Sequence, residues 1–175
     1  MKTPSHDASI EPRWRLLAIG LDPDKTVPDL YGVIHDGEPD TPLMIDGRIV
    51  LFTDPARAPE LIRQYGGPWV ADPMEVSKPT LWCDVAQALH HLSAGGMDSS
   101  ASIVDAVNVL LDLVRASGTA IVDSRRRALY AIANYCTTSK DLTKYLEEEG
   151  DHSSRELVDA VLWCVGAVVV KARIV

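Results

Sequence analysis

Proline sets the strongest limit on what this chain can fold into. All 11 prolines lie at or before Pro79, and the 96 residues that follow contain none. Proline removes a backbone hydrogen-bond donor and breaks both helix interiors and central strands. We therefore expect a flexible tail at residues 1–12, a strand-rich part at residues 13–75 and a helical part at residues 80–173.

Short patterns within the first part predict its individual elements. Residues 15–21 and 30–35 are candidate strands. The dipeptide Asp46-Gly47 lies between two apolar runs and is typical of a tight hairpin turn. Residues 55–65 have the apolar spacing of a short helix, and residues 69–71 form a last candidate strand.

The proline-free part has helical spacing and capping signals almost throughout. Ser153 and Glu156 match the capping box S-x-x-E, and Asp123 is a candidate N-cap. One helix is apolar except for a narrow polar stripe, so we expect it to be largely buried. The stripe consists of Asp105, Asn108, Asp112 and Arg115. The predicted helices cover residues 80–92, 102–116, 123–135, 138–149 and 156–169.

Strands followed by helices indicate an α+β fold rather than an alternating parallel one. We expect a small, mainly antiparallel sheet from the N-terminal half, packed on an α-helical bundle from the C-terminal half. Residues 1–175 would form a single domain, because a sheet of 60 residues is marginal alone. Trp82 and Trp163 are expected in the core.

The charge balance excludes some classes of partner. The formal net charge is −8, which disfavours binding to nucleic acid or to an anionic membrane surface. The longest apolar run, residues 160–170, is shorter than the roughly 20 residues that cross a bilayer. The first 12 residues lack the apolar segment of a signal peptide. Three widely spaced cysteines suit a reducing compartment, so we expect a cytoplasmic protein.

Acidic residues concentrate in one segment of the first part. Residues 22–46 contain seven acids and one base, Lys25, and carry a net charge of −6. They fall on predicted turns and strand ends, which lie at the surface, where ordinary solubilising loops would also explain them. Like charges that repel one another also suggest an electrostatic role toward a basic partner. The candidate partner-binding residues are Asp22, Asp24, Asp29, Asp36, Glu38 and Asp40.

A second candidate site lies in the loop at residues 93–100, which reads S-A-G-G-M-D-S-S. It resembles the pyrophosphate-binding loop of the ATP pyrophosphatases, S-G-G-x-D-S. The resemblance implies that Gly95, Gly96, Asp98 and Ser99 bind a nucleotide phosphate before a helix N-terminus. Ala94 interrupts the pattern, and the segment before the loop is predicted to be a helix, not the family's strand. A plain connection between two helices is the alternative.

No catalytic, cofactor or metal motif is found elsewhere. Adjacent His90 and His91 point in different directions on a helix and do not converge on one ion. The main hypothesis is therefore a non-enzymatic protein-binding module, with the profile of a bacterial inhibitor or immunity protein that occludes a basic partner such as a toxin. The alternatives are a nucleotide-binding enzyme that uses the loop at residues 93–100, and a homo-oligomeric structural or scaffold subunit.

Overall fold

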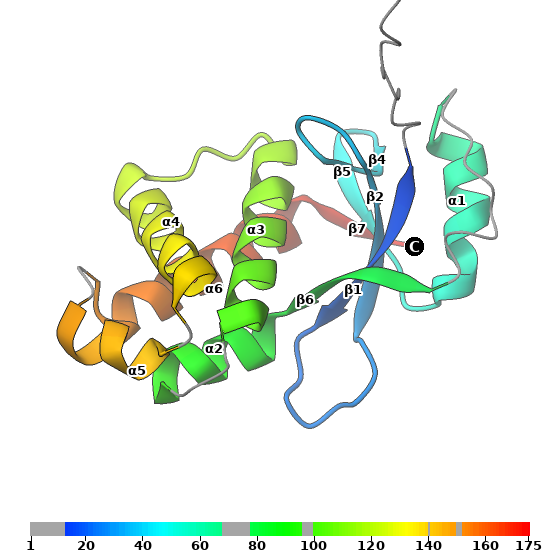
Figure 1. Ribbon diagram of the computed structural model, residues 1–175. Helices are drawn as coiled ribbons and strands as arrows, with labels where there is room; N and C mark the ends of the chain where they lie inside the picture. The colour runs from blue at the N-terminus through cyan, green and yellow to red at the C-terminus, as the bar shows by residue number, and fades with distance from the viewer. Residues whose placement is uncertain (1–12, 68–77, 96–99, 140, 150–151) are drawn as a thin grey trace, which may run out of the picture.

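The computed structural model describes residues 13–67, 78–95, 100–139, 141–149 and 152–175. The tail predicted at residues 1–12 and the strand predicted at residues 69–71 lie outside these ranges. The α+β fold class is confirmed, with helices α2 to α6 gathered on one side of the sheets and α1 on the other side (Figure 1).

The larger sheet has four strands in the order β3-β2-β1-β6. Strands β1 (Trp14–Gly20) and β2 (Leu30–His35) lie where residues 15–21 and 30–35 were predicted as strands. They pair antiparallel, from Trp14 opposite His35 to Ile19 opposite Leu30. The short β3 (Thr41–Pro42) pairs antiparallel with β2. The edge strand β6 (Pro79–Asp84) pairs parallel with β1.

A smaller sheet joins residues 44–51 to a strand at the C-terminal end of the described chain. Strands β4 (Met44–Ile45) and β5 (Arg48–Leu51) form the predicted hairpin. Asp46 and Gly47 both have positive φ, 52° and 72°, as a type I′ turn requires. The third strand, β7 (Ala172–Ile174), pairs parallel with β5. Strands β6 and β7 thus come from the part that was predicted to be helical.

The helix predicted at residues 55–65 is present as a 3₁₀ turn, Pro55–Arg57, followed by α1 (Ala58–Tyr65). It covers one face of the larger sheet, where Trp14 and Phe52 belong to a shared buried cluster. The opposite face of the sheet packs on the remaining helices. The buried cluster between them includes residues from Leu17 on β1 to Val168 on α6. These helices are α2 (Val85–Ala94), α3 (Ser100–Ala116), α4 (Asp123–Thr138), α5 (Leu142–Lys144), a π-helical turn (Tyr145–Glu149) and α6 (Ser154–Lys171).

One predicted helix, residues 80–92, is wrong in its first part. Residues up to Asp84 form strand β6, and only the rest forms α2, which Asp84 caps by accepting a hydrogen bond from Gln87. The apolar positions fit a helical period, but pairing with β1 imposes the strand alternation. Cys83 is buried, whereas Trp82 is 51% exposed, which corrects its predicted place in the core.

The capping predictions have mixed outcomes. Ser153 and Glu156 form the complete reciprocal box at the start of α6. Asp123 is not an N-cap: Val122 holds that position, and Asp123 begins α4 and pairs with Arg126 at 3.2 Å. An acid in the first turn still stabilises the positive end of a helix, so the residue type is explained without a cap.

Candidate binding cleft

The six predicted partner-binding residues do not form one surface. They separate into two loops at opposite ends of the β1–β2 pair, whose register spans Trp14 to Ile19. At about 3.4 Å per residue, the two ends are roughly 17 Å apart. The β1–β2 loop holds Asp22, Asp24 and Asp29, and the β2–β3 loop holds Asp36, Glu38 and Asp40.

The β1–β2 loop contains its own counter-charge. The Asp29 carboxylate accepts hydrogen bonds from the amides of Leu21, at 2.7 Å, and Asp22, at 3.0 Å. Lys25 forms ion pairs with Asp29 and with Asp22. The Lys25 ammonium group and the two amides hold the pKa of Asp29 below its usual range. These contacts are local, so they shape the loop itself; Asp24 makes no ion pair with any described residue.

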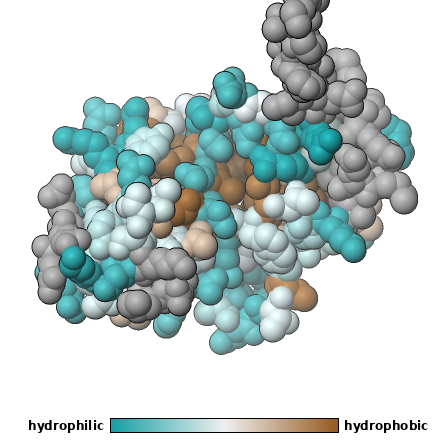
Figure 2. All heavy atoms as spheres, viewed as in Figure 1, coloured by the Kyte–Doolittle hydropathy of each residue, from teal (hydrophilic) through white to brown (hydrophobic). Residues whose placement is uncertain are grey.

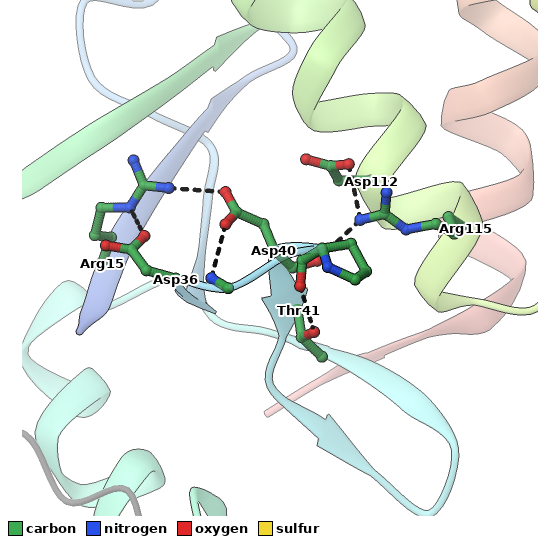
Figure 3. Close-up of polar contacts among 8 residues, drawn as sticks. Arg15, Asp36, Asp40, Thr41, Asp112 and Arg115 are labelled. Carbon is green, nitrogen blue, oxygen red and sulfur yellow. Dashed lines mark hydrogen bonds and ion pairs between the residues drawn. The ribbon is translucent and has the colours of Figure 1, made fainter. Parts of the chain in front are cut away.

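The β2–β3 loop is joined instead to distant elements (Figure 3). The Arg15 guanidinium group, on β1, forms ion pairs with Asp36 and with Asp40, the second at 2.8 Å. The other Asp40 oxygen accepts a hydrogen bond from the Gly37 amide at 3.1 Å. Arg15 therefore holds both ends of this loop against the sheet.

A second arginine ties the same loop to the helical half. Arg115, on α3, donates to the backbone carbonyl of Asp40 at 3.1 Å and pairs with Asp112 at 2.9 Å (Figure 3). In Figure 3 the side chains of Arg15 and Arg115 approach the loop from its two sides. The result is a chain of alternating charges from β1 through the loop to α3.

A cleft of about 270 Å³ opens between this network, the edge strand β6 and helix α3. The polar stripe predicted on α3 contributes Asp105, Asn108 and Asp112, which share one helix face because they are three, four and seven residues apart. Figure 2 shows this side of the molecule, where hydrophobic residues gather between helices and sheet and hydrophilic residues flank them. The lining consists of Arg15, Ile34, Asp40, Thr80, Leu81, Trp82, Asp105, Asn108, Val109 and Asp112.

Negative charge is in excess in the cleft. Its lining includes three carboxylates and one cation, Arg15, which Asp36 and Asp40 already engage. Asp105 and Asn108 are exposed and make no hydrogen bond or ion pair with any described residue. Burial raises the pKa of Asp112, and the nearby Asp40 charge raises it further, against the opposing effect of Arg115. A cation in the cleft would relieve this repulsion.

The described side chains show neither a metal-binding cluster nor a thiol of lowered pKa. No group of three histidine, cysteine or acidic residues in the described ranges could hold a metal ion. Burial raises the pKa of Cys83 to about 12 and of Cys136 and Cys164 to about 11, so these thiols are not nucleophilic at neutral pH. Sequence reasoning identified the stripe on α3 but assigned it no role, because nothing local shows which surface it faces.

The loop at residues 93–100 connects helix α2 to helix α3, not a strand to a helix. Gly95 ends α2 with φ of 70°, and its amide bonds to the carbonyl of His91 at 2.8 Å. A Cβ at Gly95 would lie 2.8 Å from the Thr143 hydroxyl oxygen, so close packing against α5 accounts for this glycine. Gly96, Asp98 and Ser99 lie outside the described residues.

Exposed apolar side chains, of the kind that a homo-oligomer would use, are spread over several elements. The most exposed in the described ranges are Val170 on α6, Val27 in the β1–β2 loop and Ile174 on β7. None of the helices in the described ranges is both long enough and apolar enough to cross a membrane.

Comparison with known proteins places the fold but not the function. No protein-family model matches the chain, and no curated protein matches it. Among solved structures, it is similar to one described as the crystal structure of the SatS C-terminal domain in complex with bromine. The TM-score is 0.60 over 93% of this chain and 94% of that chain, with 14% sequence identity. At this identity the likeness concerns the fold alone.

Proposed function

We propose that this chain is a non-enzymatic protein-binding module that accepts a basic segment of a protein partner in the cleft between β6 and α3. The observation that carries the proposal is the convergence of Asp40, from the β2–β3 loop, with Asp105 and Asp112, from α3. Asp40 is at least 65 residues from the other two acids in the sequence. Arg15 pairs with Asp40 and Arg115 pairs with Asp112, whereas exposed Asp105 adds a negative charge that no described residue pairs.

The physical roles follow from exposure. Exposed carboxylates such as Glu38 and Asp105 steer a basic partner by long-range attraction, which salt weakens. Partly buried Asp112 acts at short range, where a lower effective dielectric makes its attraction for a cation stronger. The proposal gives no contact role to Asp22, Asp24 and Asp29, which lie at the other end of the β1–β2 pair. Occlusion of a partner's basic site, as in an inhibitor or immunity protein, is the form of binding that we favour.

The test is a titration of the isotopically labelled full chain with a short arginine-rich peptide, followed by nuclear magnetic resonance. We expect amide shifts around Asp105, Asn108 and Asp112, and saturation that weakens as salt rises. The double variant Asp105→Asn/Asp112→Asn should lower the affinity about tenfold or more, because each lost charge-assisted bond is worth about 1.5–3 kcal/mol.

The matched control removes the same two charges at the other end of the sheet. Asp22→Asn/Asp24→Asn should change the affinity by less than about twofold, since only the remote Coulomb attraction is lost. Equal losses in the two double variants would mean that net charge, not the cleft, attracts the peptide. That result would contradict the proposal.

A further inference from the structure

The outer edge of β6 is unoccupied by any described part of the chain. Strand β6 is the last strand of its sheet, and β1 is its hydrogen-bonded neighbour. In Figure 1, β6 crosses in front of β1 and β2, with no other labelled element before it. An edge strand leaves a row of backbone N–H and C=O groups without partners, which a further strand can pair.

The same strand forms one wall of the acidic cleft. Residues 80–82 line the cleft across from Asp105 and Asn108 on α3, and Leu81 is the one of them that packs against the core on the helical side. The exposure of successive residues on β6 alternates: Thr80 and Trp82 are exposed, whereas Cys83 is fully buried. The two faces of β6 therefore differ, one turned to the helices and one presenting Thr80 and Trp82.

We propose that the partner segment binds as an extended strand added to the outer edge of β6. This inference rests on the proposed function and specifies the partner. Side chains of an added strand point alternately to the two faces of the sheet. Those on the side of α3 reach the carboxylates of Asp105 and Asp112 and must be arginine or lysine. Those on the opposite side share the sheet face of Trp82, whose side chain alternates with that of Leu81, and are apolar or aromatic.

The partner class is therefore an extended segment in which basic and apolar residues alternate. Backbone pairing to β6 supplies affinity that does not depend on charge, and the cleft selects the basic positions. A helical basic segment or a run of consecutive basic residues would satisfy the acids but not the strand edge. This difference makes the inference testable apart from the proposed function.

The experiment uses the full chain and a peptide of about eight residues with alternating arginine and valine. Two further peptides have the same sequence but carry N-methyl groups on all the valine amides or on all the arginine amides. In a strand, these two sets of amides face opposite edges, so each modification blocks one edge. We expect one methylated peptide to bind at least tenfold more weakly and the other to bind within about threefold of the parent.

Hydrogen exchange supplies the second readout. Bound parent peptide should slow exchange of outward-facing amides of β6, and the blocked peptide should not. If both methylated peptides bind like the parent, or if both fail, strand addition is overturned. If the parent binds with the charge dependence expected of the cleft but without edge selectivity, the proposed function survives and this inference fails. A parent peptide that does not bind overturns both.

Discussion

The two acidic loops have similar compositions but different structural roles. The β1–β2 loop contains its own cation: Lys25 contacts Asp29 and Asp22 within the loop. The β2–β3 loop has no internal base and is held by Arg15, 25 residues from Asp40, and by Arg115, 75 residues from Asp40. An acidic loop can therefore be stabilised within itself, when its cation lies in the loop, or can connect distant elements, when its cations lie on those elements.

The largest difference between the loops should follow from removing their cations. The side chains of Asp36 and Asp40 are only 30% and 29% exposed, and Arg15→Ala removes the cation that pairs with both. This substitution should destabilise the protein by about 2 kcal/mol. Lys25→Ala removes an exposed ammonium group from a solvated loop and should cost clearly less. Urea denaturation of both variants measures the difference. Equal losses of unfolding free energy in the two variants would mean that the two loops do not differ in how their cations stabilise the fold.

A smaller loss of stability should follow from removing Arg115, which connects the β2–β3 loop to α3. Arg115→Ala loses the hydrogen bond to the Asp40 carbonyl and the pair with Asp112, and should destabilise by about 1 kcal/mol or less because the side chain is half-exposed. Arg126→Ala is the matched control, since Arg126 has the same spacing to Asp123 and a similar exposure. Its effect should be smaller, as it joins no distant loop. Thermal unfolding of both variants decides whether the long-range bond matters.

The smallest effects concern pH, and they should have opposite signs in the two regions. The lowered pKa of Asp29 means that its ionised form stabilises the fold above about pH 4, and that this contribution is lost as the pH falls through the lowered pKa. The raised pKa of Asp112, caused mainly by burial, means that its charge opposes folding at neutral pH. That penalty disappears as the pH falls through the raised pKa.

Asp29→Asn should therefore be less stable than the parent at pH 7, with a difference that closes toward pH 3. Asp112→Asn should be equal to or more stable than the parent at pH 7, and its advantage should close as the pH approaches 4. Denaturant unfolding at several pH values measures both differences. If both variants were less stable than the parent at pH 7, or both more stable, the inference that Asp29 is stabilised by its surroundings and Asp112 is not would be wrong.

Sequence reasoning succeeded where local chemistry decides the structure. Strand β2 has the predicted bounds, Asp46-Gly47 forms the predicted turn, and the Ser153 box begins α6. Each depends on residues that are neighbours in the chain. Strand β6 was missed because Leu81 and Val85 fit a helical spacing equally well, and only pairing with β1 makes the first part a strand.

The sequence shows the residues that line the cleft but not that they come together. The acids of the β2–β3 loop and the stripe on α3 are both visible in the sequence, but nothing local indicates that they meet. Arg15 and Arg115 reach the loop from separate elements, so no spacing rule connects them to Asp40. The six candidate partner-binding acids lie in two separate loops for the same reason: proximity along the chain does not imply proximity in space.

The smaller sheet has a consequence for how the chain folds during synthesis. Ile49 on β5 pairs with Ala172 on β7, so two segments more than 120 residues apart share one ladder. Contacts at such separations slow folding, because a long loop must close before the contacts stabilise it. On the ribosome, the β4–β5 hairpin must wait with an open edge until the segment that forms β7 has emerged. A hairpin that is made early is thus completed by a strand that is made more than 120 residues later.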